Sequence, residues 1–286
     1  MNNWDDVRFF LEVARQGNLT AAARELGVNH STVARRIKAL EDRQGVRLFE
    51  QLSSGYKLTD DAYEVYELAL DIEALNYRFS RKLQGLDSRL QGRVALTMPH
   101  DIFEFFLAEH LAQFQEQHPE IVLDLLVAKG LKNLSHREAD IALRLTDTPP
   151  EYLVGKQLCE LHYGLYQSSK FQNPESHTPI ITWSDQAQVP SWAVEHLPAP
   201  SIRLHVNDLL AMYKAVEAGL GIARMPVYMH NCYRSPKVQQ LPTKLPKSKW
   251  GVWLLSHADL RKTARVQALK QFLQSTLEQH LALFTA

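Results

Sequence analysis

Apolar residues recur at intervals of three and four through the first forty positions, a spacing that predicts amphipathic helices. A first helix is expected over residues 4–16, where two aspartates in the first turn suit the helix dipole. A second is expected from Thr20, as N-cap, to Gly27, which suits the left-handed residue that ends a helix. Asn29 is then expected to cap a third. Two helices joined by so short a turn are typical of a helix-turn-helix.

The third helix, within VNHSTVARRIKALE (residues 28–41), divides into an apolar face and a basic face. The apolar arc consists of Val33, Ile37 and Leu40. Arg35 and Lys38 lie roughly opposite, at about 100° per residue. We interpret the apolar face as the side that packs on the first two helices and the basic face as free to enter a DNA major groove. The alternative is a solvated surface helix.

A hairpin and a long helix are expected next. Two apolar segments flank a Ser-Ser-Gly turn within residues 46–59, which predicts the β-hairpin of a winged helix. From Thr59, a suitable N-cap, no proline occurs until Pro99. Positions 65, 69, 72, 76, 79, 83, 86 and 90 are Val, Ala, Ile, Asn, Phe, Leu, Leu and Leu. This heptad spacing, with one polar residue, favours a coiled-coil contact with a second subunit, the alternative being a helix packed on its own domain.

Beyond Gly92 the pattern changes to alternating strands and helices, which predicts parallel α/β architecture. Strands are expected at 93–97, 121–127, 140–145, 161–166, 180–183, 202–206, 221–225 and 250–256. Helices are expected at 102–117, near His136, up to Gly219 and at about 259–280. Two similar halves in succession suggest two lobes with a ligand-binding cleft between them.

Composition and charge restrict the function. No stretch approaches the roughly 18 apolar residues of a membrane span, and the acidic start does not resemble a signal peptide, so we expect a cytoplasmic protein with no membrane contact. Two cysteines, Cys159 and Cys232, are too few for a disulfide framework or a zinc site. The net charge is zero, yet residues 24–47 hold six Arg and Lys against three acids. A local basic patch therefore exists within a neutral protein.

The chain carries no motif of catalysis or cofactor binding. It lacks G-x-S-x-G, H-E-x-x-H and the phosphate-binding G-x-x-x-x-G-K-S/T, and Gly219 and Gly221 follow a helix rather than a strand. We therefore expect no enzyme, no metal and no cofactor. Two classes of function stay open: a ligand-responsive DNA-binding regulator, and a ligand-binding or scaffolding protein whose N-terminal helices mediate association. Arg35 and Arg36 favour the regulator, because an association helix needs an apolar exposed face whereas a groove-reading helix needs hydrogen-bond donors.

The stretch TAAARELGVNHSTVARRIKALEDRQGVRLFE, residues 20–50, resembles the DNA-binding signature of the LysR-type transcriptional regulators. The resemblance covers the whole chain. It implies a winged helix-turn-helix, a dimerising linker helix and a two-lobed, periplasmic-binding-protein-like α/β effector domain. Gln51 stands where the wing of that family usually carries Arg, and Ala34 where Ser is usual.

From these patterns we assign residues 1–58 to the winged helix-turn-helix, 59–91 to the linker helix and 92–286 to the effector-binding domain. Lobe 1 is expected at about 92–160 and 257–286, and lobe 2 at about 161–256. The expected partners are double-stranded operator DNA and a second copy in a homodimer. The family resemblance also implies a tetramer formed through the effector domains. RNA polymerase is a further expected partner.

Candidate site residues follow from these elements. The DNA-binding candidates are His30, Ser31, Thr32, Arg35, Arg36, Lys38, Arg47 and Lys57. The effector-binding candidates are Thr97, Met98, Pro99, His100, Lys129, Arg144, Asn207 and Arg224. The last residues of strands and the first residues of the following helices favour a small polar ligand, and the family resemblance implies a small organic acid or other metabolite.

Each group of candidates has an alternative interpretation. Arg36 lies nearest the apolar face and could form an ion pair with an acid of its own domain. Thr97 and Asn207 could simply cap helices. Asp101 and Asp208 would repel a carboxylate ligand, a repulsion that the basic candidates offset only if their side chains point into the cleft.

Overall fold

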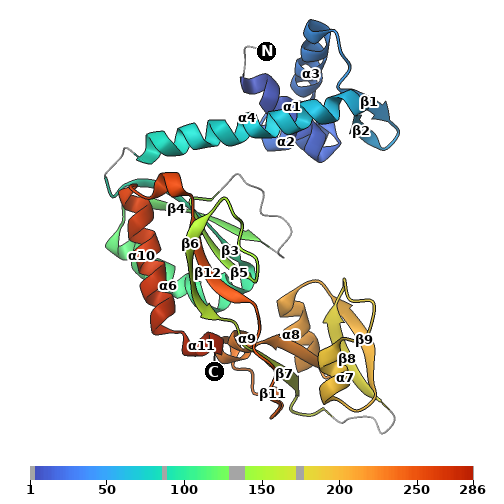
Figure 1. The fold of residues 1–286 in the computed structure, drawn as a ribbon, viewed down its shortest axis with the longest axis vertical. Coiled ribbons are helices and arrows are strands. Elements are labelled where there is room, and N and C mark those ends of the chain that lie inside the picture. The colour runs from blue at the N-terminus through green and yellow to red at the C-terminus, as the bar shows by residue number, and fades with distance from the viewer. Residues whose placement is uncertain (1–3, 86–88, 129–138, 172–176, 286) are drawn as a thin grey trace. The chain divides into compact units, whose positions relative to one another are not determined.

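The computed structural model describes residues 4–85, 89–128, 139–171 and 177–285 (Figure 1). The chain forms two compact units, residues 1–82 and 83–286. The sequence prediction of a helix near His136 lies outside the described residues.

The first unit is a three-helix domain with a two-stranded hairpin. Its elements are α1 (Trp4–Gln16), α2 (Leu19–Leu26), α3 (His30–Gln44), β1 (Phe49–Leu52), β2 (Gly55–Leu58) and α4 (Asp60–Gly85). The apolar face of α3 is buried against α1 and α2. The hairpin is antiparallel, with Phe49 opposite Leu58. The predicted winged helix-turn-helix is therefore confirmed.

The helix ends of this unit depend on asparagine and glycine. Asn18, rather than Thr20, caps α2, because its side-chain oxygen accepts from the Thr20 amide at 2.8 Å. The prediction of Thr20 as N-cap is wrong by two residues. Gly27 ends α2 in the left-handed conformation at φ 67°, as predicted. Asn29 precedes α3 in an extended conformation and makes no side-chain capping bond.

Glycine at position 55 allows the hairpin to contact the turn between α1 and α2. The Tyr56 amide donates to the Gly17 carbonyl oxygen at 2.7 Å. A Cβ atom at Gly55, where φ is 131°, would lie 2.2 Å from that same oxygen. Only glycine tolerates both the positive φ and the close carbonyl oxygen of Gly17. This contact therefore sets the position of the hairpin within the domain.

The linker helix α4 begins as predicted and has two different sides. The Thr59 hydroxyl oxygen accepts from the Ala62 amide at 3.3 Å. On the inner side, Ala62, Ala69 and Glu73 are buried. Arg15 of α1 binds Glu73 at 2.7 Å, although burial still raises the pKa of the Glu73 carboxyl. This side is therefore part of the core of the first unit.

The outer side of α4 is apolar and exposed, and its register differs from the predicted one. The exposed apolar side chains are Val65, Leu68, Ile72, Leu75, Phe79 and Leu83. At 100° per residue these six fall within an arc of about 80°. Ala69, which the predicted seam included, is instead buried on its own domain. The described helix reaches Gly85. The predicted seam position at Leu86 lies outside the described residues, and the one at Leu90 is not helical.

A five-stranded mixed sheet forms the first lobe of the second unit. Its strands are β3 (Gly92–Pro99), β4 (Ile121–Ala128), β5 (Ile141–Thr146), β6 (Val154–Glu160) and β12 (Gly251–Ser256), in the order β4-β3-β5-β12-β6. Strands β4, β3 and β5 are parallel, as predicted, whereas β12 is antiparallel to both neighbours. Strand β12 was assigned to lobe 2 and β6 was not predicted. Both corrections arise because the chain returns to the first sheet near residue 250.

The second lobe contains the other five-stranded sheet. Its strands are β7 (Tyr163–Ser168), β8 (Thr178–Trp183), β9 (Pro200–Val206), β10 (Ile222–Pro226) and β11 (Val238–Gln240), in the order β11-β7-β10-β8-β9. Its helices are α7 (Ser191–His196), α8 (Leu209–Glu217) and α9 (Val227–Tyr233). The sequence predicted α8 but missed the short α7 and α9.

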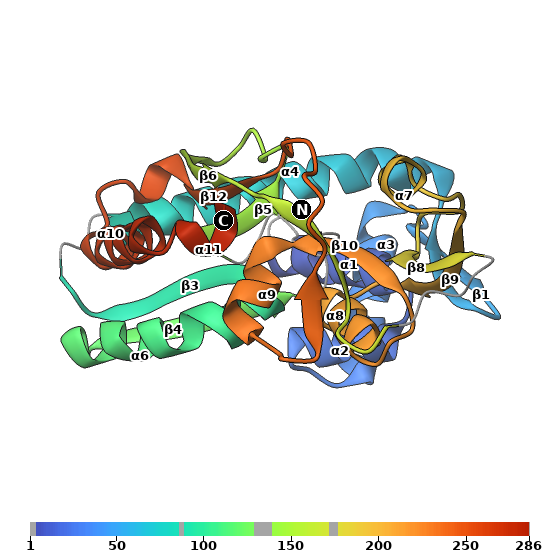
Figure 2. The same ribbon diagram turned by 90° about the horizontal axis from the view of Figure 1, so that it is seen from below.

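Helices cover the first sheet and reach toward the second lobe. From residue 100 to 117 one helical segment comprises α5 (His100–Ile102), the π-helical η1 (Phe103–Leu107) and α6 (Ala108–Gln117). The chain ends with η2 (Ala258–Leu260), α10 (Ala264–Gln279) and α11 (Ala282–Thr285). Helices α6 and α10 contact each other through Phe114 and Phe272, whose ring centroids are 5.3 Å apart. Figure 2 shows both helices together with strand β3 of the first sheet. Helix α9 packs on α11 and η1, which joins the two lobes.

Candidate DNA-binding surface and effector site

The outer face of α3 offers hydrogen-bond donors to solvent. His30, Ser31, Arg35 and Lys38 are exposed, and Thr32 is half-buried. Within the described part of the chain, neither Arg35 nor Lys38 makes an ion pair. The buried face of the same helix holds it in the domain core, so its donors are presented on a fixed support.

Arg36 is placed differently from the other basic residues of α3. Its guanidinium lies 3.7 Å from Asp5 and 3.9 Å from Asp6, both on α1. It also lies over the ring of Phe9, 5.2 Å from the centroid. The structure therefore shows the ion-pair arrangement that the sequence left as the alternative for this residue.

The sequence missed a second arginine in the same contact. Arg43, at the end of α3, donates to the buried Asp6 carboxylate at 2.6 Å. Asp6 thus binds α3 at two points, and both guanidiniums serve to hold α3 on α1. The sequence shows that Asp6 lies in the first turn of a helix, but its partners Arg36 and Arg43 lie 30 and 37 positions away.

The hairpin contributes two more basic side chains. Arg47 and Lys57 are exposed, as is Gln51. The Glu41 carboxylate accepts from the Leu48 amide at 2.7 Å and from the Phe49 amide at 3.2 Å, which links α3 to the start of the hairpin. The candidate DNA-binding surface consists of the exposed residues of α3 together with these two basic residues.

In the second unit the structure brings Thr97 and Arg144 together. Both are buried, with 3% and 8% of their surface exposed. Arg144 donates to the Leu143 carbonyl at 2.9 Å and to the Thr97 hydroxyl oxygen at 3.3 Å. Burial lowers the pKa of Arg144 to about 10. No carboxylate of the described residues pairs with this guanidinium, so the site has an uncompensated positive charge.

Charged residues also connect the two lobes. His100 lies 3.3 Å from Asp208, from its Nε2 to the carboxylate Oδ2. Asp208 also caps α8, because its Oδ1 accepts from the Ala211 amide at 2.8 Å. The expected repulsion from Asp208 is therefore reduced by two partners. Asn207, by contrast, is exposed and is not the cap.

A second pair across the lobes involves Asp101. The hydroxyl group of Tyr228, on α9, donates to the Asp101 carboxylate, and both residues are buried. Burial raises the pKa of Asp101, while the Tyr228 hydrogen bond and the charge of His100 act in the opposite direction. Neither the burial of Tyr228 nor its partner was indicated by the sequence.

Replacing Tyr228 with Phe is expected to lower the free energy of unfolding by about 2 kcal/mol, because a buried carboxyl group loses its donor. A carboxyl pKa raised by folding gives stability that is complete below the ordinary Asp pKa and is lost as pH rises through the folded pKa. In Tyr228→Phe the pKa of Asp101 should rise further, so the loss of stability with rising pH should extend to higher pH. Urea unfolding from about pH 4 to pH 7 measures this. Identical profiles for the variant and the wild type would contradict it.

The remaining effector candidates differ in their surroundings. Arg224 lies over the ring of Tyr163, 4.2 Å from the centroid, and burial lowers its pKa. Met98 is buried in the core, so its side chain is not available to a ligand. Pro99 is half-buried at the start of α5, and Lys129 lies outside the described residues. Thr97, His100, Arg144 and Arg224 are therefore the candidates with suitable positions.

Neither cysteine has the properties of a reactive thiol. Cys159 and Cys232 are half-buried, and burial raises the pKa of each thiol to about 11. The thiolate form that reacts or binds metal is thus rare near neutral pH. In the described part of the chain, no cluster of His, Cys, Asp and Glu could hold a metal ion. Among the described helices, none has both the length and the apolar character to cross a membrane.

Two family models match the chain. That of the bacterial regulatory helix-turn-helix proteins of the lysR family matches residues 4–63, and that of the LysR substrate binding domain matches residues 87–278. The chain belongs to the LysR family of transcriptional regulators. It is a DNA-binding regulator with an effector-binding domain, as the sequence resemblance implied, and the scaffolding alternative is not supported.

Individual relatives agree with this family. The LysR-type regulator is 23% identical to the probable regulator LtrA of Klebsiella pneumoniae, over 97% of this chain and 96% of LtrA. It is 25% identical to PtxR of Pseudomonas aeruginosa, over 98% and 93%. An HTH-type regulator of Xanthomonas campestris is 30% identical, but the match spans 58% of this chain and about half, 48%, of that relative.

Solved structures show the same fold. CrgA of Neisseria meningitidis, a LysR-type transcriptional regulator, has a TM-score of 0.54 at 21% identity, over 98% of this chain and 99% of CrgA. The Vibrio cholerae virulence activator AphB has a TM-score of 0.57 at 18% identity, over 96% and 99%. The two-lobed architecture of the LysR-type regulator is thus shared along its whole length.

Proposed function

We propose that this regulator binds its operator as a homodimer that pairs through the outer side of α4. The proposal is supported by six exposed apolar side chains in one narrow arc of a 26-residue helix. A monomeric protein rarely exposes so continuous an apolar stripe. Two-fold symmetry then places two half-sites about one DNA turn apart, or a multiple of it. A tetramer formed through the effector domains and a contact with RNA polymerase extend this proposal.

Base contacts are assigned to the start and the outer face of α3. We propose that Arg35, with His30, Ser31 and Thr32, contacts base edges, while Lys38, Arg47 and Lys57 contact phosphates. The exposure of these side chains and their position on a fixed helix support the assignment. Arg36 contributes to the position of α3 through Asp5 and Asp6.

Arg35→Ala should weaken specific operator binding by about 1 to 3 kcal/mol and alter the preference among sites, because a guanidinium can bridge two acceptors on guanine. Lys38→Ala should weaken binding to all sequences alike and reduce the salt dependence by about one phosphate contact. Gel shifts of wild-type and mutated operator at two salt concentrations separate the two effects. Arg8→Ala, which removes an exposed arginine of α1, is the control. Equal affinity and preference for Arg35→Ala and the control would exclude the assignment.

For the effector we propose a small organic acid, bound between the lobes without any cofactor. The observation that carries this proposal is the buried Arg144 guanidinium, which has no carboxylate partner among the described residues. Buried charges are normally paired, and a carboxylate ligand matches the planar guanidinium in two hydrogen bonds. The Thr97 hydroxyl oxygen already accepts from Arg144, so its own proton is available for the ligand.

The regulatory step follows from the position of the charged pairs. His100 with Asp208, and Asp101 with Tyr228, join residues of the two lobes. We propose that a carboxylate bound at Arg144 changes the relative position of the lobes and thereby the operator binding of the dimer. A gel shift against the DNA upstream of the regulator's own gene, with and without a panel of small carboxylates, tests this. Unchanged binding with every carboxylate that stabilises the protein thermally would contradict the coupling.

A further inference from the structure

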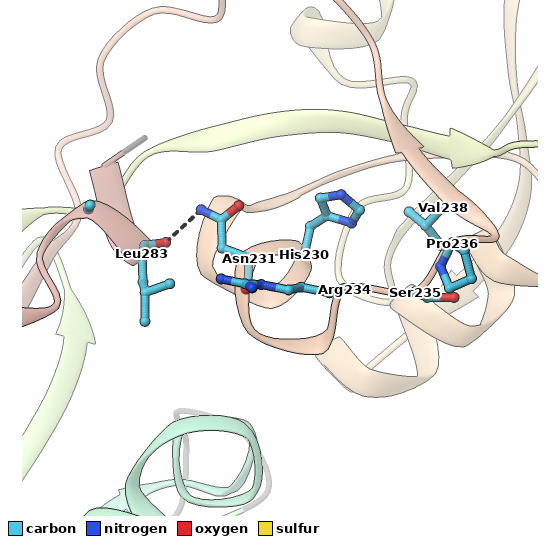
Figure 3. A pocket seen from close by; sticks show the side chains of 8 residues that line it. His230, Asn231, Arg234, Ser235, Pro236, Val238 and Leu283 are labelled. Carbon is cyan, nitrogen blue, oxygen red and sulfur yellow. Dashed lines mark hydrogen bonds between the residues drawn. The ribbon is translucent and has the colours of Figure 1, made fainter.

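A cavity of about 560 Å³ lies beside α9 and α11, away from the residues assigned to the effector (Figure 3). Its lining consists of His230, Asn231, Arg234, Ser235, Pro236, Val238, Ala282 and Leu283. None of these belongs to the group around Arg144. Asn231, on α9, donates from its side chain to the Leu283 carbonyl oxygen of α11 at 3.0 Å. The cavity is therefore built where an element of lobe 2 meets the last helix of the chain.

Arg234 occupies a backbone position that arginine normally avoids. It ends α9 in the left-handed conformation, with φ 48° and ψ 39°, and its amide donates to the His230 carbonyl oxygen at 2.8 Å. Glycine or asparagine is the usual residue at such a helix end, because other side chains are strained there. Retained strain of this kind is a feature of functional sites. The guanidinium is the part of Arg234 that glycine and asparagine could not supply.

The Arg234 side chain is exposed and lines the cavity, and its guanidinium is not neutralised within the described residues. Its Nε donates to the Asn231 carbonyl oxygen at 2.8 Å, and no described carboxylate forms an ion pair with it. The nearby Glu217 is already bound by the Ser235 hydroxyl and, at 3.0 Å, by Lys214. Burial lowers the pKa of His230, so this side chain is neutral near pH 7. Arg234 thus supplies the permanent positive charge of the lining.

The rest of the lining suits the apolar body of a small molecule. Pro236, Val238, Ala282 and Leu283 contribute aliphatic surface, and the volume lies within the range of small-ligand sites, about 300 to 1,000 Å³. The imidazole of His230 is held in place by Tyr166, with ring centroids 5.3 Å apart, and by the Tyr213 hydroxyl at 3.3 Å. One charge beside an apolar wall matches an organic anion that carries one carboxylate and a hydrophobic group.

We propose that this cavity is a second ligand site, specific for a small apolar carboxylate held by Arg234, and separate from the site at Arg144. A ligand there contacts both α9 and α11, the two helices that Asn231 and Leu283 join. The bound ligand would therefore strengthen a contact between the lobes, although its site lies apart from the residues that we assign to the effector.

The test uses para-bromobenzoate with the full-length protein and locates the bromine atom by anomalous diffraction from soaked crystals. Calorimetry in solution compares the wild type with Arg234→Asn, Arg144→Met and the exposed control Arg261→Ala. Asparagine tolerates the left-handed conformation, so Arg234→Asn should unfold at the wild-type temperature or above it. It should nevertheless weaken binding by about tenfold or more, as should replacing the probe with neutral para-bromobenzamide.

Each result decides the proposal. Bromine density beside Arg234, lost in Arg234→Asn and kept in Arg144→Met, supports the second site whatever the outcome for the effector proposal. Bromine found only beside Arg144, binding by Arg234→Asn equal to that of Arg261→Ala, or no saturable binding up to about 20 mM would overturn it.

Discussion

The double variant Phe79→Asp and Leu83→Asp is expected to sediment as a monomer at concentrations where the wild type is a dimer. Phe79 is 64% exposed and Leu83 54% exposed on the outer side of α4, so the folded chain tolerates the change. In the paired helices, the same carboxylates would be buried beside apolar side chains and beside each other. Operator affinity should fall by at least 100-fold, because each winged helix would then bind alone.

A matched control separates pairing from a general effect of charge on the helix. Ala74 is exposed on α4 but lies about 140° away from the centre of the apolar stripe. Ala74→Asp should therefore remain dimeric and keep its operator affinity. Analytical ultracentrifugation and circular dichroism of both proteins give assembly and fold together. If the double variant sediments like the control, the stripe packs on another partner.

Arg144→Met is expected to remove the response to the effector without loss of fold. The guanidinium is buried, and its pKa of about 10 shows that its environment disfavours the charge. Methionine has a similar length and removes that cost, so the free energy of unfolding without ligand should stay equal or rise by about 1 kcal/mol. Binding of a carboxylate effector should weaken by at least 50-fold, because its charge would then be buried without a partner.

Thermal unfolding with a metabolite panel provides the measurement. An effector at 100 times its dissociation constant adds about 2.7 kcal/mol to the wild type, and this increment should disappear in Arg144→Met. The exposed Arg203→Met is the matched control. A metabolite that stabilises Arg144→Met and Thr97→Val as much as the wild type binds elsewhere.

The sequence predicted the elements that depend on neighbours along the chain. The three helices, Gly27 at a helix end and the hairpin follow from local spacing and local turn chemistry. The sequence also identified Thr97 and Arg144 as candidates from their places on two strands. It could not show that they are in contact, because this depends on β3 and β5 being neighbours in the sheet.

Three differences have a common cause in long-range packing. Leu68 is exposed and Ala69 is buried because the core of the first unit covers one side of α4. The Arg36 guanidinium of α3 pairs with Asp5 of α1 because these two helices are docked, a fact that no local pattern contains. Tyr228 and Asp101 are 127 positions apart, so neither residue indicates the other.

The length of α4 also determines how far the winged helix moves when the two paired helices rotate against each other. Its inner residues, Ala62 and Ala69 among them, fix the winged helix to the N-terminal part of the helix, while Phe79 lies about 25 Å further along at 1.5 Å per residue. A change of about 10° in the crossing angle of two such helices would displace the far end by about 4 Å. Successive bases along a DNA strand are about 3.4 Å apart. A small rotation where the helices cross would therefore move each DNA-binding helix α3 by about one base pair, so the preferred distance between half-sites is the quantity that the proposed effector would adjust.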